Sequence, residues 1–269
     1  MNQVINPIYL DKAKMAELRH AYETNPPCRH IIMDNFLVEE VASQMYSNFP
    51  PLDTLNVKRK SLNEQKSEDY HFDRFHPVFT KVREMIMSKE FAAWMVAVTG
   101  IENLYVTDDS LGSGVHQGGN GSYVDVHIDI NVNAKANAWR RLNLLIYLNQ
   151  NWQAEYGGDL ELWNPEMTKM EVKYAPLFNR AIVFYTDENA PHGYRKMTLP
   201  EGVTRKSFYT YFYTPMEEGV AFRDSQFLAR PDESPLKRML TTVKEGLKIT
   251  AKKVLYKLGV KSLDFQDKN

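Results

Sequence analysis

The chain changes character after residue 100, and its second part restricts the possible folds more than any other feature. From residue 101 to residue 214, short runs rich in β-branched and aromatic residues alternate with clusters of Gly, Asn, Asp and Pro. Such runs are typical of β-strands, and about seven of them at this spacing indicate a sandwich or a barrel. The runs are ENLYVTDD, SYVDVHIDI, RLNLLIYLN, GGDLELWN, MEVKYAP, RAIVFYT and RKSFYTYFYT.

The part before residue 101 has mainly helical periodicity. Apolar residues recur at helical spacing over residues 10–23, 38–49 and 77–99, so we expect a helix in each of these segments. We also expect a short strand within residues 28–37 and a polar surface loop at 52–70.

Length and composition fit one principal domain. With 269 residues, of which 43% are hydrophobic, the chain can bury a sizeable core without disulfide or metal staples. We predict a mainly β fold with flanking helices, in which residues 101–216 form the β core. Residues 1–100 are expected to form a mainly helical support region of the same domain, and residues 217–269 a C-terminal extension.

The C-terminal extension contains a basic amphipathic segment. Residues 235–261 carry eight Lys or Arg residues and one acid, Glu245, so their net charge is +7; because the whole chain is at −1, the remainder is at −8. We expect a helix that begins at Pro235 and ends near Gly259. Its apolar residues fall on one stripe: Leu236, Met239, Leu240, Val243, Leu247, Val254, Leu255 and Leu258.

Three alternatives are open for this helix. We favour packing of the apolar stripe on the β core, with the lysines in solvent. The helix could instead contact an anionic surface, such as nucleic acid or phospholipid, or lie in a groove of a partner or second subunit. No clear nucleic-acid motif accompanies the basic residues.

Cys28 is the only cysteine, which excludes an internal disulfide framework and any metal site built from several thiolates. The N-terminal 20 residues lack the apolar region of a signal peptide. No run approaches the roughly 18 apolar residues that a membrane span requires. We therefore expect a cytoplasmic protein.

Two histidines and one aspartate are candidate metal ligands. His127 and Asp129 are two residues apart on an expected strand, so their side chains point to the same face. His192 follows the buried run RAIVFYT, in a short loop after four expected strands that can return the chain to the same cavity. Two imidazoles and one carboxylate on one face of an octahedron leave three positions open, as in non-haem iron(II) oxygenases.

Three further residues are candidates for binding 2-oxoglutarate. Its distal carboxylate needs a cation, and Arg205 lies 13 residues after His192. A guanidinium binds a carboxylate through two parallel hydrogen bonds, which lysine does not. Ser207 shares the face of Arg205 on the same expected strand, and Tyr147 could add a phenolic donor.

The His-x-Asp pattern alone is weak, because the chain contains it a second time at His71-Phe72-Asp73. That second copy lies between a polar loop and a helix, and about 60 residues after it there is no histidine at a strand end that is followed by Arg-x-Ser. The ordered set around His127 is therefore the stronger candidate.

The stretch from about residue 113 to residue 214 resembles the core of 2-oxoglutarate- and iron(II)-dependent dioxygenases, specifically the prolyl 4-hydroxylase-like branch. The matching motifs are HID at 127–129, LLIYLNQNW at 144–152, GGDLELW at 157–163, RAIVFYTDENAPHGY at 180–194 and TRKSFYTYFYT at 204–214.

The resemblance implies a double-stranded β-helix, or jelly-roll, core of the cupin-like kind. It implies His127, Asp129 and His192 as iron ligands, Arg205 as the partner of 2-oxoglutarate and Tyr147 as its neighbour. Fe(II), 2-oxoglutarate and O2 are the implied cofactors, with ascorbate as a candidate addition. Related hydroxylases often place a tyrosine near the co-substrate, on the strand before the His-x-Asp motif. In this chain either His116 or Tyr123 could occupy that position.

We therefore expect hydroxylation of a C–H bond, with a prolyl or other side chain of a protein as the substrate. The alternative substrate is a free small molecule, such as an amino acid or a natural-product intermediate. A non-catalytic metal-binding β-barrel and a cupin-type enzyme without an oxo-acid co-substrate are the rival functions. An open metal site argues against the first rival and Arg205 with Ser207 against the second.

Overall fold

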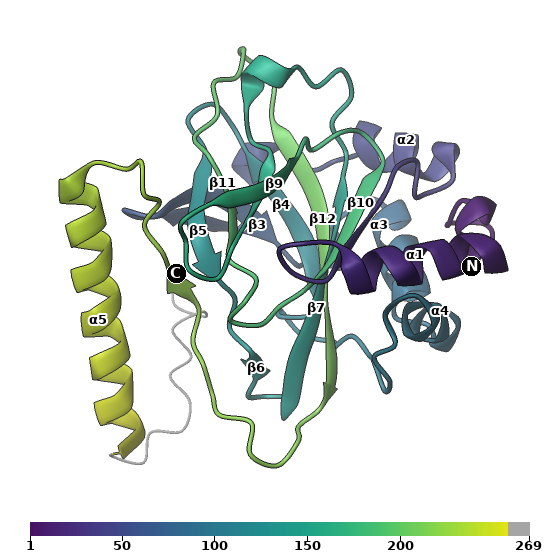
Figure 1. The fold of residues 1–269 in the computed structure, drawn as a ribbon. Helices are drawn as coiled ribbons and strands as arrows, with labels where there is room; N and C mark the ends of the chain where they lie inside the picture. Colours follow the sequence, from purple (N-terminus) through teal and green to yellow (C-terminus); the bar gives the residue numbers. More distant parts are fainter. Residues whose placement is uncertain (258–269) are drawn as a thin grey trace.

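The computed structural model describes residues 1–257, in which thirteen antiparallel strands form one sheet that folds over on itself (Figure 1). The main path of the sheet runs β1-β10-β7-β12-β4-β3-β5-β11-β8-β9. The strands are β1 (His30–Met33), β2 (Val57–Lys60), β3 (Glu64–Asp69), β4 (Ser113–Gly118), β5 (Tyr123–Ile128), β6 (Val132–Asn133), β7 (Ala138–Tyr147), β8 (Leu160–Trp163), β9 (Met170–Tyr174), β10 (Arg180–Tyr185), β11 (His192–Tyr194), β12 (Arg205–Pro215) and β13 (Gln226–Phe227).

Two halves of this sheet face each other and are joined through β3. One half contains β1, β10, β7, β12 and β4, and the other contains β5, β11, β8 and β9. Strand β3 pairs with β4 near one end and with β5 near the other. This arrangement is the jelly roll, so the predicted fold class is confirmed.

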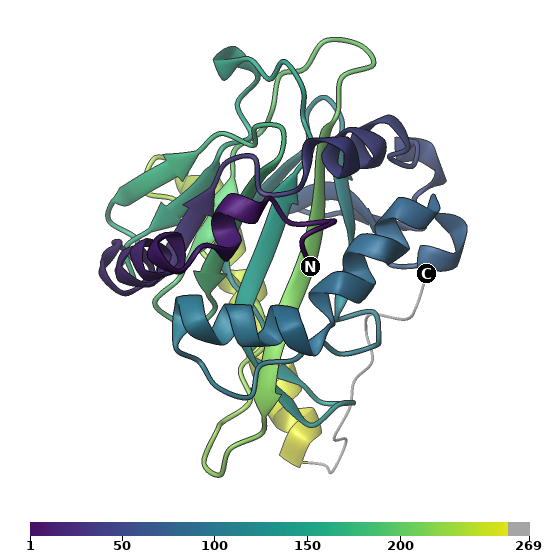
Figure 2. The same ribbon diagram turned by 90° about the vertical axis from the view of Figure 1, so that its right-hand side faces the viewer.

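Helices cover the outer face of the half that contains β10, β7 and β12 (Figure 2). Along β7, Leu142, Leu144 and Ile146 pack toward these helices, whereas Leu145 and Tyr147 pack between the two halves. Both faces of β7 are buried, which explains its nearly continuous apolar sequence. The helices are α1 (Lys12–Thr24), α2 (Glu39–Ser47), α3 (Pro77–Ile86), α4 (Lys89–Thr99) and α5 (Pro235–Lys257), with 3-10 turns at Pro7–Leu10, Leu52–Thr54, Phe72–Arg74 and Ala154–Tyr156.

The segment expected as one helix over residues 77–99 is two helices. Helix α3 ends at Ile86, and the hydroxyl of Ser88 accepts a hydrogen bond from the Phe91 backbone N–H to begin α4. A serine at this position competes with continuation of the helix and favours a new N-terminus. The run ENLYVTDD is also not a full strand, because it contributes only an isolated bridge between Tyr105 and Tyr213.

Residues 52–70 were expected to form a surface loop, and this prediction was wrong. They contain the hairpin β2–β3, and β3 lies between β4 and β5. Lys66 and Glu68 of β3 line the space between the two halves of the sheet. A strand whose inner face is charged lacks the apolar alternation by which a half-buried strand is recognised.

The favoured prediction for helix α5, that its apolar stripe packs on the β core, was wrong, because its polar side faces the sheet instead. Leu236 and Leu247 of its apolar stripe are 63% and 68% exposed, whereas Thr241 and Glu245 on the other side are buried against the sheet. Polar contacts to the body, rather than apolar burial, therefore hold the helix. The expected helix end near Gly259 lies outside the described residues.

None of the helices in residues 1–257 is long and apolar enough to span a lipid bilayer.

Candidate metal centre

Strand pairing brings the candidate metal ligands together. His192 is the first residue of β11 and lies directly opposite His127 of β5, and Asp129 follows the end of β5. One ligating atom from each of the three side chains lies within 4.8 Å of the others. The His127 Nε2 atom is 3.4 Å from one carboxylate oxygen of Asp129, and the His192 Nε2 atom is 3.9 Å from the other.

The second nitrogen of each histidine fixes which ring atom faces the centre. His127 Nδ1 is 3.1 Å from the Asp125 carbonyl oxygen, and His192 Nδ1 is 3.0 Å from the Ala190 carbonyl oxygen. A carbonyl only accepts hydrogen bonds, so each Nδ1 carries the proton and each Nε2 keeps a free lone pair. This is the tautomer that binds a divalent metal, with the ring oriented by its backbone partner.

The charge state of the site also suits a cation. Burial would raise the pKa of Asp129, but its neighbours His127, His192 and Arg140 hold that pKa well below its usual value. Burial and the neighbouring His127 lower the pKa of His192 to about 4, so its imidazole is neutral near pH 7. The buried Asp129 Oδ2 atom has no hydrogen-bond donor in the described part of the chain. The neutral imidazole of His192, together with a carboxylate oxygen of Asp129 that accepts no hydrogen bond, fits a divalent ion.

Gly193 allows β11 to approach β5 closely at this point. A Cβ atom at residue 193 would lie 2.7 Å from the Val124 carbonyl oxygen and 2.9 Å from that of Asp125. Glycine directly after His192 therefore keeps the two histidine-bearing strands together. The glycine is visible in the sequence as part of the motif His-Gly-Tyr, but the close approach of two strands that requires it is visible only in the structure.

Arg205 lies in the same cavity and is buried. Its Nε donates to the Gly158 carbonyl oxygen at 2.8 Å, and one terminal nitrogen donates to the Tyr147 hydroxyl at 3.2 Å. Its guanidinium also lies over the rings of Tyr147 and Tyr194. None of the described acidic residues forms a salt bridge with it, so a buried positive charge is available to an anion. Ser207 lies opposite Tyr147 in the sheet and lines the same cavity, of about 100 Å³.

The structure thus gathers all six sequence-predicted residues around one cavity. A model of the 2OG-Fe(II) oxygenase superfamily matches residues 113–213, from the first residue of β4 nearly to the end of β12. This segment belongs to that superfamily. We call residues 113–213 the oxygenase core.

The curated relatives to which the oxygenase core is similar are prolyl hydroxylases. Prolyl hydroxylase EGLN3 of Mus musculus and of Homo sapiens is in each case 30% identical over 119 residues. The aligned part is 44% of this chain and 46% of the relative. The chain therefore spans about half the length of the curated relatives that it matches.

Solved structures share the fold. A prolyl-4-hydroxylase of Pseudomonas putida has a TM-score of 0.53 at 14% identity, and the match covers 73% of this chain and 98% of that one. A prolyl hydroxylase of Trichoplax adhaerens, in complex with a hypoxia inducible factor peptide, has a TM-score of 0.52 at 21% identity, covering 76% and 90%. HygX of Streptomyces hygroscopicus, with nickel, 2-oxoglutarate and hygromycin B bound, has a TM-score of 0.51 at 12% identity, covering 78% and 97%.

A second cavity of about 150 Å³ adjoins the metal centre of the oxygenase core and contains residues that sequence reasoning missed. Glu68 there contacts Arg59, Lys66 at 3.2 Å and His116 at 3.2 Å. Burial alone would lower the pKa of Lys66, but the nearby Glu68 carboxylate raises the pKa of Lys66 above its usual value. Burial and Lys66 lower the pKa of His116 to about 4, so this imidazole is neutral near pH 7.

His116, rather than Tyr123, lies beside the metal centre. The ring of His116 stacks on Tyr209 with 4.2 Å between the centroids and lines the cavity of Arg205. The hydroxyl of Tyr123 instead donates to backbone carbonyls of the β2–β3 turn. The side chain of Arg140, 3.6 Å from Asp129 and 3.7 Å above the Tyr211 ring, also reaches the second cavity.

A buried ion network lies behind the two histidine-bearing strands. Arg230, which follows β13, donates to Asp125 of β5 at 3.1 Å and to Glu161 of β8 at 2.9 Å. All three side chains are less than 5% exposed. Asp125 is two residues before His127, so this network connects the C-terminal extension to the strand that carries a candidate metal ligand.

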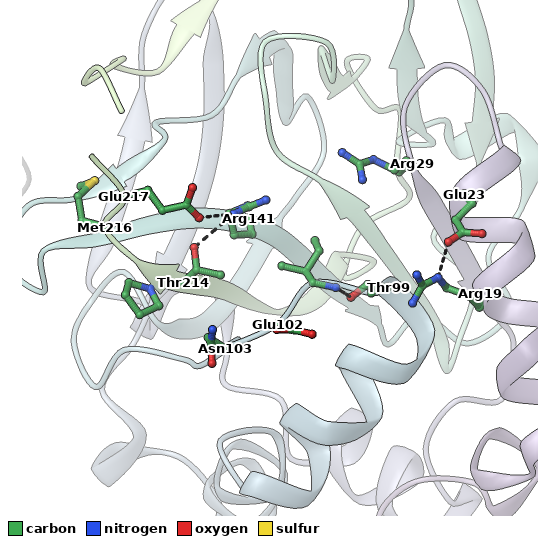
Figure 3. Close-up of a pocket in the computed structure, with 13 residues that line it drawn as sticks. Arg19, Glu23, Arg29, Thr99, Glu102, Asn103, Arg141, Thr214, Met216 and Glu217 are labelled. Atoms are coloured by element: carbon green, nitrogen blue, oxygen red, sulfur yellow. Dashed lines mark hydrogen bonds and ion pairs between the residues drawn. The ribbon is translucent and has the colours of Figure 1, made fainter. Parts of the chain in front are cut away.

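A third cavity, of about 460 Å³, is larger than the two beside the metal centre and shares no lining residue with them. Figure 3 shows the residues that line it. It is bordered by α1, the turn after α4 and the end of β12, and its arginines include Arg19, Arg29 and Arg141. Glu23 and Glu217 pair with two of them. None of the six predicted site residues lines it, so size alone is a poor guide to the site in this chain.

Proposed function

We propose that this chain is an Fe(II)- and 2-oxoglutarate-dependent dioxygenase that hydroxylates a C–H bond. One observation carries the proposal: an open set of two imidazoles and one carboxylate shares a cavity with buried Arg205, which pairs with no acid in the described residues. Structural metal sites are usually closed by four protein ligands, so an open set disfavours a non-catalytic module. Arg205 disfavours an enzyme without an oxo-acid co-substrate.

In this proposal each candidate residue has one role. His127, Asp129 and His192 would hold Fe(II), and Arg205 would bind the distal carboxylate of 2-oxoglutarate. Tyr147 orients the guanidinium through its hydroxyl, and Ser207 lies beside it as a second donor. When bound, iron and 2-oxoglutarate supply oxidative decarboxylation to succinate coupled to oxidation of a C–H bond.

The proposed substrate is a prolyl or other side chain of a peptide. The curated relatives are named prolyl hydroxylases, and this supports a peptide substrate. A free small molecule is the second candidate, because Arg59, Lys66 and Glu68 give the adjoining cavity a charged lining that a compact polar molecule would match. Mass spectrometry that detects a gain of one oxygen, in proline-containing peptides or in a metabolite extract, separates the two.

Anaerobic addition of Fe(II) and 2-oxoglutarate tests the reaction class. We expect a weak visible charge-transfer band, followed in air, with ascorbate present, by formation of succinate. Absence of both the band and succinate from correctly folded protein would exclude the proposed co-substrate.

Arg205→Ala is expected to raise the KM for 2-oxoglutarate by about 10- to 100-fold, because a hydrogen bond to a charged group contributes roughly 1.5–3 kcal/mol. Arg205→Lys should recover only part of this loss, since an ammonium does not reproduce the two parallel hydrogen bonds. Succinate formation against 2-oxoglutarate concentration is the measurement. Lys206→Ala, one residue along β12 on its opposite face, is the matched control; an equal effect of both changes would argue against the assigned role.

Metal binding should stabilise the fold. At a free Co(II) concentration about 100 times Kd, ligand linkage adds about 2.7 kcal/mol to the free energy of unfolding. For a chain of this size we expect the Tm to rise by roughly 5–10 °C. Differential scanning fluorimetry with Co(II), and then with excess chelator, measures the shift; an unchanged Tm would count against the metal site.

A further inference from the structure

Helix α5 presents a continuous apolar face to solvent. Eight large hydrophobic side chains are exposed in the described residues, and five of them lie on this helix. Their spacing of three or four residues places them on one face. The five are Leu236, Met239, Leu240, Val243 and Leu247. The largest contiguous apolar patch on the surface of a soluble chain is often an interaction site.

The opposite face of α5 is attached to the body by polar contacts. Lys237 forms a salt bridge with Asp125 at 2.8 Å, and Thr241 accepts a hydrogen bond from Asn63 at 2.9 Å. Lys248 pairs with Glu245 of the same helix and donates to the Ser225 carbonyl oxygen. Rotating the helix to bury its leucines would break these contacts, so the apolar face is held outward.

We propose that α5 docks this protein on an anionic phospholipid surface, with its apolar face inserted at the level of the headgroups. The supporting observation is charge complementarity. Residues 235–261 have a net charge of +7 while the rest of the chain is at −8, so a negative surface attracts this segment and repels the remainder. The chain is therefore oriented with α5 toward the surface, in the manner of an interfacial amphipathic helix.

The neighbouring hairpin extends the same surface. Asn63, in the β2–β3 turn, contacts both Thr241 and Lys244 of α5. Leu62, directly before it, is among the eight exposed hydrophobics, and Lys60 is exposed at the end of β2. An apolar side chain and a cation thus border the helix on the side of the body.

Two other occupants fit the face less well. A second copy would bring two segments of +7 together, and their repulsion opposes pairing of the two stripes. Nucleic acid would match the charge of the segment. However, proteins bind single-stranded nucleic acid by stacking bases on aromatic side chains, and the five exposed apolar side chains include no aromatic residue. Figure 1 shows α5 on the opposite side of the molecule from α1 and α4, so docking there leaves the other helices unaffected.

Flotation of the full chain with unilamellar vesicles tests the proposal. We expect it to float with vesicles of phosphatidylcholine mixed with phosphatidylserine, to stay behind with pure phosphatidylcholine, and to be released by high salt. Leu240→Gln with Leu247→Gln should weaken binding by at least about tenfold, because the apolar insertion is lost. Arg238→Gln, at an exposed cation, should weaken it about fivefold.

Thr242→Gln, exposed on the same helix and already polar, is the matched control and should float like the unmodified chain. Circular dichroism should be unchanged in all variants, and flotation requires no turnover, so this test is independent of the proposed function. Failure of the unmodified chain to float, or undiminished flotation of the double variant, would overturn the proposal. Sedimentation as a dimer without vesicles, abolished by the double variant, would assign the face to a second copy instead.

Discussion

Replacing His192 with alanine is expected to abolish succinate formation and to lower metal affinity by more than about 100-fold. Changing a residue that only supports a metal ligand typically costs 10- to 100-fold, and loss of a ligand itself should exceed that range. His192 is directly opposite His127 and is 5% exposed, and among the described residues the group of candidate ligands contains no third histidine. Anaerobic titration with Fe(II), together with turnover in air, measures both effects.

The chain offers a matched control for this substitution. His20 lies on the exposed side of α1, and its side chain is remote from the cavity, so His20→Ala should leave both metal affinity and turnover unchanged. Circular dichroism checks that the His192 variant is folded. Retention of tight Fe(II) binding by folded His192→Ala protein would remove this histidine from the proposed ligand set.

Replacing Arg230 with methionine is expected to lower the free energy of unfolding by about 3 kcal/mol. Breaking a buried ion pair from one side costs roughly 3–5 kcal/mol, because the remaining charge stays buried. We expect the lower end, since Asp125 keeps Lys237 and Glu161 keeps Arg195 as partners. Urea unfolding followed by fluorescence measures the change.

The same network permits a stricter test. Neutralising both carboxylates, with Asp125→Asn and Glu161→Gln, should offset part of the loss when combined with Arg230→Met, because no unpaired charge is then buried. Arg238→Met, at an exposed position on α5, should change stability by less than about 0.5 kcal/mol. If Arg230→Met were as mild as Arg238→Met, the network would not stabilise the fold.

Local patterns in the sequence were enough to predict a sandwich or barrel and to identify the candidate ligands, and the family resemblance implied the jelly roll. The nearly continuous apolar run of β7 predicted a strand buried on both faces, and the structure confirms this. The two-residue spacing of His127 and Asp129 predicted a shared face, and β11 returns His192 beside them. Each of these inferences depends on strand periodicity or on the order of segments along the chain, and both can be read directly from the sequence.

Charged groups that are buried against distant partners were missed for a common reason. Lys66 and Glu68 lie on a strand without apolar alternation, so residues 52–70 resembled a surface loop. The sequence analysis did not single out Arg230, whose partners Asp125 and Glu161 are 105 and 69 residues away. Such a residue is recognisable only when both members of the pair have been placed in space.

Helix α5 shows most clearly what the sequence determines and what only the tertiary structure determines. The sequence by itself determined that the segment is helical, basic and amphipathic, because these properties depend on spacing and composition within one turn or two. Only the tertiary structure decided that the polar face packs inward, since the balance between burying leucines and pairing Lys237 with Asp125 depends on what the neighbouring strand presents. The same holds for the whole chain: periodicity defines the faces of each element, and the sheet decides which faces meet.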